Sequence, residues 1–179
     1  MANDYHLTSQ WRVRGSPDEV AAILREPMDL VRWWPEVYLD VRVEEADGGP
    51  VVHVLTRGFL PYMLSWQFRE VERDWPRGAS IEAHGDLVGR GTWTLVREGP
   101  ETVATYDWRV RAEKPWLRRL APLLQPLFAW NHRWTTPRGE QGLQRYLRAR
   151  HGRLPALVGA PEALPASASA PAERLPLAA

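Results

Sequence analysis

Two adjacent side chains, Asn131 and His132, form the most suggestive polar pair in this sequence. The spacing of apolar residues around them predicts a helix that carries Asn131 on its buried stripe, where a purely structural helix would prefer Leu. A buried Asn is costly without a partner, so we expect its amide to bond to a strand side chain, a water molecule or a ligand. His132 falls about 100° away on the flank of the stripe. We interpret it as a rim or surface residue rather than as a general base.

Other residues that commonly carry catalysis or bind metals form no recognised motif. The chain has no cysteine, and its five histidines, at positions 6, 53, 84, 132 and 151, make no metal-ligand spacing. A phosphate-binding loop and a Gly-x-Ser-x-Gly motif are both missing from the sequence. The sequence therefore predicts no metal site and no cofactor, and it leaves any catalytic residue unassigned. We expect His53 and His84 to face solvent.

Bulky aromatic side chains form the second group of candidates. Aromatic residues in strands are most often plain core, but several that face a helix carrying an Asn would suit a pocket for a sterol, aromatic or acyl ligand. Trp33 and Trp34 could gate such a pocket or could pack a short helix down. The predicted ligand-binding residues are Trp66, Phe68, Trp93, Tyr106, Trp108, Leu127, Asn131 and Thr135.

The polar pair lies in the only segment with sustained helical periodicity, residues 114–152. The apolar stripe of this segment changes direction between Thr135 and Leu143. Pro137 and Gly139 lie in that gap, so we expect the helix to bend near Pro137. Its stripe before the gap contains Leu117, Leu120, Leu124, Leu127, Phe128, Asn131, Trp134 and Thr135.

The start of this helix contains two further prolines, at 122 and 126. Each would cost roughly 3 kcal/mol inside a regular helix. We therefore expect a short helical piece over residues 116–121 and a main helix that begins near one of these two prolines.

The chain before the helix reads mostly as strands. Residues 5–14 alternate between apolar and polar, and Ser16-Pro17-Asp18-Glu19 then predicts the start of a helix that runs to about Arg25. A second short helix is expected over residues 28–33. Six further strands follow, and short turns between them require antiparallel pairing. We interpret glycines 85, 89 and 91 as a bulge or bend that curves the sheet.

Length and composition fit one domain with a sizeable core. The chain has 179 residues and ten tryptophans, and its net charge of +1 gives no field that would gather nucleic acid. We predict a domain over residues 1–152 and a disordered tail, rich in Ala and Pro, over residues 153–179. The start of the chain resembles no export signal and the longest apolar run is too short to span a membrane, so we expect a cytoplasmic protein.

Positive charge is concentrated in the predicted long helix. Residues 116–153 contain eight arginines and a single acid, Glu140. The simpler interpretation is a solvated outer face. The alternative is a docking surface for an anionic membrane or an acidic partner protein, formed by Arg118, Arg119, Arg133, Arg145 and Arg148.

Three stretches together resemble one superfamily: GDLVGRGTWTL, then TYDWRVRAEKPWLRRLAPLLQPLFAWNHRW, then GEQGLQRYL. They look like the START-related ligand-binding proteins called SRPBCC or polyketide cyclase/dehydrase-like. The opening strand, SPDEVAAIL and RWWP fit the N-terminal half of that family, and the resemblance covers roughly residues 4–150.

The resemblance implies an α+β, helix-grip (START-like) fold. In this fold a curved antiparallel sheet of about seven strands grips a long C-terminal helix over a hydrophobic cavity, with two short helices after the first strand. The fold serves lipid carriers, aromatase/cyclases, hormone receptors and pollen allergens, so it implies little about function.

Three functions stay open on the sequence. We favour binding of a small lipophilic molecule, such as a lipid, sterol, polyketide or aromatic compound, between the sheet and the C-terminal helix. A polyketide cyclase or dehydratase is the enzymatic alternative, although no activated acid or base can be placed in the pocket. A docking module that uses the arginine-rich helix is the third. The oligomeric state is not predicted.

Overall fold

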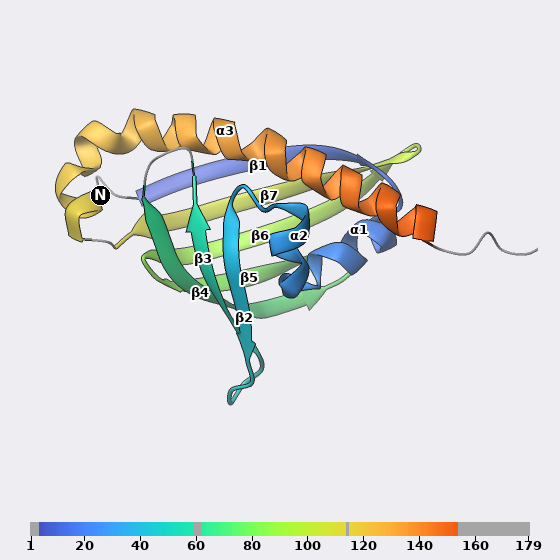
Figure 1. Ribbon diagram of the computed structural model, residues 1–179, viewed down its shortest axis with the longest axis horizontal. Helices are drawn as coiled ribbons and strands as arrows, with labels where there is room; N and C mark the ends of the chain where they lie inside the picture. The colour runs from blue at the N-terminus through green and yellow to red at the C-terminus, as the bar shows by residue number, and fades with distance from the viewer. Residues whose placement is uncertain (1–3, 59–61, 114, 154–179) are drawn as a thin grey trace, which may run out of the picture.

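The computed structural model describes residues 4–58, 62–113 and 115–153, and for residues 115–129 and 153 it describes the backbone only. Strands dominate the first two thirds of the chain, and one long helix follows them (Figure 1). In chain order the elements are β1 (Asp4–Arg14), α1 (Pro17–Leu24), the 3-10 helix η1 (Pro27–Asp29), α2 (Leu30–Trp33), β2 (Tyr38–Glu44), β3 (Val51–Arg57), β4 (Met63–Asp74), β5 (Gly78–Gly85), β6 (Leu87–Glu98), β7 (Glu101–Ala112) and α3 (Pro115–Arg153).

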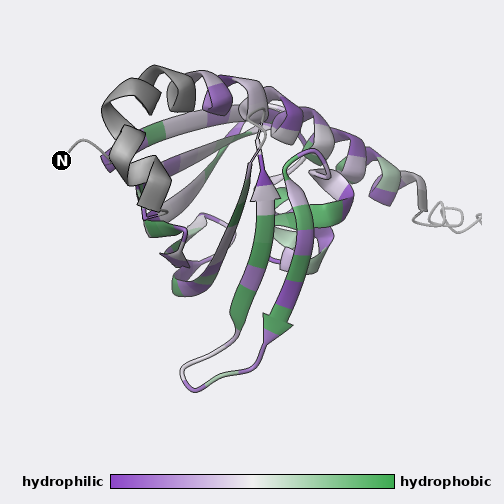
Figure 2. Cartoon of the chain, turned by 60° about the vertical axis from the view of Figure 1, so that its left-hand side comes forward, coloured by the Kyte–Doolittle hydropathy of each residue, from purple (hydrophilic) through white to green (hydrophobic). Residues whose placement is uncertain are grey.

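The seven strands form one antiparallel sheet in the order β1-β7-β6-β5-β4-β3-β2. The first strand pairs with the last along its full length, from Asp4 opposite Arg111 to Arg14 opposite Glu101. All other pairs are sequence neighbours, as expected for strands that short turns connect. The sheet is curved, and Figure 2 shows the β2–β3 hairpin extending away from the rest of it. The predicted helix-grip architecture is confirmed.

The short helices between β1 and β2 begin where the sequence predicts. Ser16 caps α1, with its hydroxyl accepting from the Glu19 backbone N–H while the Glu19 carboxylate accepts from the Ser16 N–H. The next helical segment starts at Pro27, and Trp33 at its end is 2% exposed. These elements pack against α3 and β2, so α3 shares the covering of the sheet with them rather than providing it alone.

The stripe of α3 that faces the domain is not the predicted one, and the predicted bend near Pro137 stays a prediction. The stripe of α3 that faces the domain runs continuously through His132, Thr136, Gly139, Leu143 and Leu147, at spacings of three or four residues that keep one face. Two members of this stripe are polar and one is glycine, so the stripe cannot be recognised from the pattern of apolar residues. The apolar pattern that runs through Asn131 and Thr135 is only its flank.

The α3 helix is continuous through Pro137. Figure 1 shows it crossing the molecule in a gradual curve. Side chains supply donors close to the proline, because Thr135 Oγ1 donates to the His132 carbonyl at 3.0 Å and Arg138 donates to the Trp134 carbonyl at 2.7 Å. The predicted separate piece over residues 116–121 is also wrong, since α3 is one helix from Pro115. A proline inside a helix can kink the helix without ending it.

The glycines near the β5–β6 turn do not mark a bulge. Gly89 and Gly91 lie inside β6, which starts at Leu87, and the register with β5 and β7 continues through both. The register shifts of the sheet lie elsewhere, between Tyr38 and Asp40 and between Glu70 and Glu72. At Gly91 the reason for glycine is space. A Cβ there would lie 2.1 Å from the Tyr106 hydroxyl oxygen.

Buried apolar side chains form two clusters. The first joins α1, α2 and the C-terminal half of α3 to β1, around Trp11, Trp33, Leu143 and Leu147. The second lies on the sheet around Val54, Trp66, Trp108 and Val110, and it borders a cavity.

None of the helices in the described part of the chain is long and apolar enough to cross a membrane. The cytoplasmic location stays a prediction. The predicted tail falls almost entirely outside the described residues, which end at Arg153, so its role also stays a prediction.

Candidate functional site

A cavity of about 510 Å³ lies between the sheet, the α1–α2 segment and α3. Its floor is built from rows of side chains that neighbouring strands bring into register. Ser9, Tyr106, Trp93 and Ala79 form one such row across β1, β7, β6 and β5. Alternate residues of a strand point to the same face. The next row toward the N-terminus of β1 therefore also faces the cavity, with Leu7, Trp108 and Ile81.

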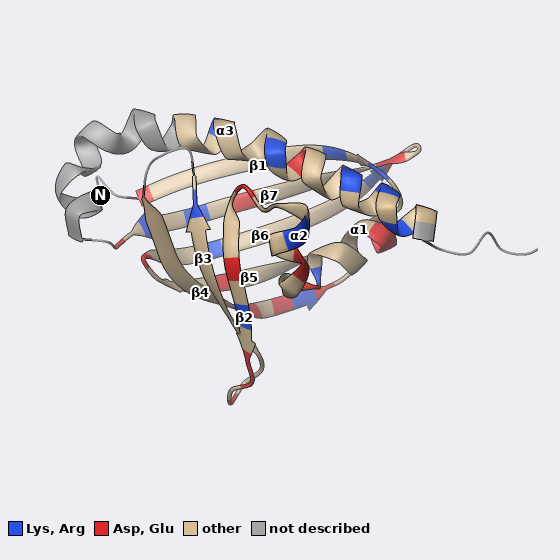
Figure 3. Cartoon of the chain, viewed as in Figure 1, with Lys and Arg blue, Asp and Glu red and all other residues tan. Residues whose placement is uncertain are grey.

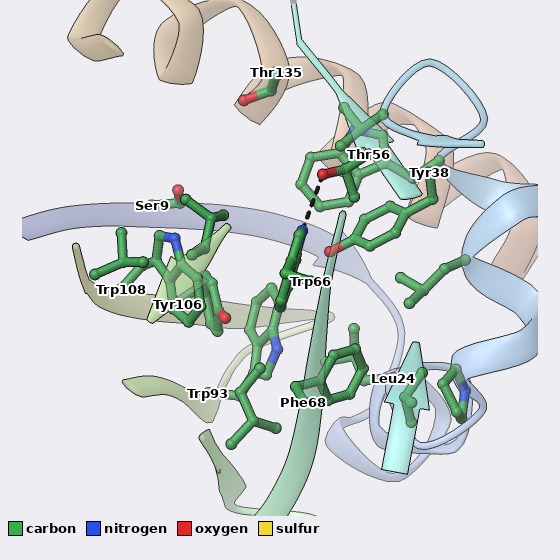
Figure 4. Close-up of a pocket in the computed structure, with 18 of the residues that line it drawn as sticks. Ser9, Leu24, Tyr38, Thr56, Trp66, Phe68, Trp93, Tyr106, Trp108 and Thr135 are labelled. Carbon is green, nitrogen blue, oxygen red and sulfur yellow. Dashed lines mark hydrogen bonds between the residues drawn. The ribbon is translucent and has the colours of Figure 1, made fainter. Parts of the chain in front are cut away.

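Stacked aromatic rings make up much of this floor (Figure 4). The ring of Tyr106 stacks between Trp93, at a centroid distance of 4.4 Å, and Trp108, at 5.7 Å. Trp66 on β4 then contacts both Trp108 and Phe68, with centroids 5.7 Å apart in each pair. The wall that results is broad and apolar, which suits a lipophilic molecule.

All five aromatic residues predicted to bind a ligand line this cavity, and so do Asn131 and Thr135 of α3. The side chain of Leu127 lies outside the described residues. That these residues contact a ligand stays a prediction. Sequence alternation placed the aromatic residues on the correct face because each strand is regular where they occur.

Asn131 packs against the end of β3. A Cβ at Gly58 would lie 2.1 Å from Asn131 Oδ1, so only a glycine lets the two segments approach this closely. The contact brings α3 against the last residues before the β3–β4 connection, where the cavity also reaches Arg57 and Tyr62. Asn131 therefore helps to close one end of the cavity.

The prediction that His132 is a rim or surface residue is wrong. This residue is half-buried on the cavity wall, where its Nε2 lies 2.9 Å from Ser9 Oγ. Ser9 Oγ also lies 3.3 Å from Thr136 Oγ1. Burial lowers the pKa of His132 below its ordinary value, so the imidazole is neutral at neutral pH. The polar cluster of Ser9, His132 and Thr136 joins β1 to α3.

The sequence analysis missed this polar cluster for a physical reason. Ser9 lies on the apolar face of an alternating strand, and His132 and Thr136 lie four residues apart on one face of a helix. That spacing was visible in the sequence. Its meaning was not, because only the tertiary structure places Ser9 opposite the pair.

Two further polar residues of the cavity, Tyr38 and Tyr106, carry hydroxyl groups. No described residue forms a hydrogen bond with either hydroxyl, and burial raises the pKa of both phenols above the ordinary value. By contrast, the indole N–H of Trp66 is satisfied, because it donates to Thr56 Oγ1 at 3.0 Å. Tyr38 was not among the residues predicted from the sequence, where it alternates with the apolar residues Val37 and Leu39. The register shift next to this residue changes the face that it occupies.

Trp33 and Trp34 pack α2 down rather than standing free as a gate. Their rings stack at 5.5 Å, and both contact Trp11, with centroids 6.3 and 5.3 Å away. The indole nitrogens of these three tryptophans are buried, and none has a hydrogen-bond partner among the described residues. All three also border the cavity at this end.

Charged side chains lie only at the edge of the cavity within the described part of the chain. Glu70 is half-buried and already accepts from Trp75 Nε1 at 2.8 Å and from Arg73 at 3.1 Å. The remaining charged lining residues are exposed: Arg25, Glu26, Glu45, Arg57 and Arg73. The interior is therefore uncharged. No group of three or more His, Asp or Glu among the described residues could hold a metal ion.

The arginines of α3 differ in their surroundings (Figure 3). Arg150 lies 3.1 Å from the buried carboxylate of Asp29, and Arg145 lies 3.9 Å from Glu36. Arg133 and Arg148 are exposed, while the side chains of Arg118 and Arg119 lie outside the described residues. Contact with an anionic membrane or an acidic partner stays a prediction.

Sequence comparisons found no relative for this chain: no family model matches it, and no curated protein matches it. Comparisons of structure found many similar chains. A protein from Thermus thermophilus matches with a TM-score of 0.69 at 17% identity, over 82% of this chain and 99% of the other. The Zhui aromatase/cyclase from a Streptomyces species matches with a TM-score of 0.64 at 16% identity, over 83% and 96% of the two chains.

A plant enzyme, a Thalictrum norcoclaurine synthase, matches with a TM-score of 0.53 at 15% identity, over 83% of this chain and 96% of the other. Identities this low establish the fold alone. This chain therefore shares the predicted helix-grip fold with these structures.

Proposed function

We propose that this helix-grip protein binds a small, neutral, lipophilic molecule in the cavity between its sheet and α3. The observation that carries the proposal is the cavity itself, about 510 Å³ with a floor of stacked aromatic rings. Ligand sites of proteins usually combine such an apolar wall with a few polar groups that orient the ligand. Here the polar groups come from Ser9, His132, Tyr38 and Tyr106.

The charge distribution supports a neutral ligand. An ionised group inside this cavity would lose its hydration and would meet no opposite charge, because the charged lining residues lie at the edge. Burial of an unpaired charge costs several kcal/mol. A neutral molecule avoids this cost and gains from contact with the aromatic floor.

An enzyme of the polyketide cyclase or dehydratase type is the second candidate, and one observation favours it. The neutral imidazole of His132 lies on the cavity wall and can accept a proton. A binding protein needs no such base. Loss of substrate conversion in His132→Gln with unchanged ligand affinity would favour the enzyme over the carrier.

Native mass spectrometry of the purified protein tests the binding proposal, with a thermal-shift panel of sterols, fatty acids and polycyclic aromatics beside it. We expect a co-purifying lipophile, or a rise in melting temperature with neutral members of the panel. Ile81→Trp should abolish both effects, because Ile81 lines the cavity and a larger ring would fill it.

The matched control is Val96→Trp, which adds a ring at a position that is 51% exposed. It should leave binding unchanged. A protein that binds no panel member and carries no lipophile would overturn the proposal. Equal binding by Ile81→Trp and the wild type would place the ligand outside this cavity.

A further inference from the structure

Most polar side chains that line the cavity already have protein partners. Ser9 bonds to His132 and lies within reach of Thr136, and Thr56 accepts from Trp66. The hydroxyl groups of Tyr38 and Tyr106 differ, since neither has a hydrogen-bond partner among the described residues. Figure 4 shows both oxygens pointing into the space between the walls. A molecule inside the cavity can therefore supply the missing partner.

The hydroxyl of Tyr106 is held in a fixed place. Stacking between Trp93 and Trp108 leaves its ring no room to turn away, and Gly91 leaves space for the oxygen directly above the β6 backbone. A hydroxyl that cannot move to another protein acceptor is preorganised for a ligand atom. Because burial keeps the phenol protonated by raising its pKa, it can donate a hydrogen bond at any pH near neutrality.

The hydroxyl of Tyr38 enters the cavity from another wall. Tyr38 lies at the start of β2, and its ring packs against Trp34 with a centroid distance of 5.6 Å. Tyr38 and Tyr106 line the same cavity from two walls (Figure 4). One bound molecule can therefore reach both hydroxyls.

We infer that Tyr38 and Tyr106 are specificity-determining residues that select ligands with neutral oxygen groups, such as a ketone, a phenol or an alcohol. This inference rests on the proposed function. A pure hydrocarbon would displace water from both hydroxyls and leave them unpaired, and an unpaired buried hydroxyl is costly. A carboxylate could accept the same hydrogen bonds, but its charge would remain uncompensated in the uncharged interior.

Three probes of one ring system test the inference: pyrene, 1-hydroxypyrene and 1-pyrenecarboxylate, measured at neutral pH by energy transfer from tryptophan. We expect the wild type to bind 1-hydroxypyrene most tightly. Tyr106→Phe should weaken binding of 1-hydroxypyrene by about two- to tenfold, the range of one neutral hydrogen bond. The same variant should bind pyrene equally or more tightly, because it removes a hydroxyl that pyrene leaves unpaired.

Tyr38→Phe should act in the same direction, and it provides a second reading if one variant folds poorly. Tyr146→Phe is the matched control, since Tyr146 lies in the C-terminal half of α3 outside the cavity lining. Wild-type protein that binds all three probes equally, or phenylalanine variants that weaken pyrene and 1-hydroxypyrene alike, would overturn the inference while leaving the proposed function intact. Failure of the wild type to bind any probe, together with a negative lipophile panel, would overturn both.

Discussion

The two halves of the described part of α3 meet the rest of the protein in different ways. In the C-terminal half, Gly139 and Gly142 let the helix approach until Trp11 and the backbone carbonyl of Trp33 touch it. In the half before Gly139, His132, Thr135 and Thr136 face a cavity of about 510 Å³. We call these the closed end and the hollow end. One helix thus packs on the core at one end and roofs the cavity at the other.

Side-chain size determines how closely a helix approaches the elements beneath it. Glycine has no Cβ, so the closed end packs tightly around two large indole rings. At the hollow end the polar side chains of α3 form hydrogen bonds at the wall, as His132 does with Ser9, and do not fill the space. The helix is therefore in close contact with the core at the closed end, and the open space lies at the hollow end.

Truncation of a tryptophan should produce the largest difference between the two ends. Trp11 is 1% exposed and packs against three other tryptophans, so Trp11→Ala should destabilise the protein by about 3–5 kcal/mol. Trp108→Ala should cost less, because Trp108 is 9% exposed and packs against two aromatic rings, those of Trp66 and Tyr106. Urea denaturation of both variants measures the difference. Equal losses would show that the floor of the cavity is packed as tightly as the closed end.

Addition of one methyl group to α3 should have the next largest effect. A Cβ at Gly142 would lie 1.8 Å from the carbonyl oxygen of Trp33, so Gly142→Ala must push α3 away from α2. We expect a loss of about 1–3 kcal/mol. Gly152→Ala is the control, since nothing lies within 4 Å of its added Cβ. That change should be neutral or stabilising, because Ala favours a helix over Gly. Melting temperatures that fall equally in both would refute the close-approach argument.

Enlargement of an alanine should destabilise the protein at the closed end but not at the hollow end. Ala21 is 3% exposed in the closed end, so Ala21→Leu should overpack it and cost about 1–3 kcal/mol. Ala79 lines the cavity, so Ala79→Leu should have little effect on stability and should reduce the affinity for a lipophile. Thermal melts with and without a bound pyrene probe measure both quantities. A destabilised Ala79→Leu would mean that the hollow end has no free space at this position.

The smallest expected effect concerns pH. Burial lowers the pKa of His132 from its ordinary value of 6.5, so below that pH the unfolded chain binds this proton more readily than the folded chain does. The folded state should therefore lose stability as the pH falls from about 7 through 6.5, until the pH passes the lowered value. His132→Gln should flatten the slope of stability against pH in this window. An unchanged slope in the variant would assign the pH dependence to other groups.

The sequence by itself determined the order of the strands and helices and the face to which most side chains point. Alternation in β1, β4 and β7 was regular, and the cap at Ser16 was unambiguous, because these signals depend on residues close together in the chain. The aromatic floor followed from the same alternation. The cavity-facing position of Tyr38 did not, since a register shift in β2 lies next to it.

Only the tertiary structure decided which stripe of α3 faces inward. Hydropathy could not show this stripe. Gly139 and Gly142 make close contacts because they have no side chain. His132 and Thr136 face inward because they contact a polar partner, Ser9, which is far away in the sequence. Likewise, only the tertiary structure shows that the hydroxyls of Tyr38 and Tyr106 have no protein partner among the described residues. Whether a polar group has a partner is a property of the space around it, and that space exists only when strands and helices from the whole chain are assembled.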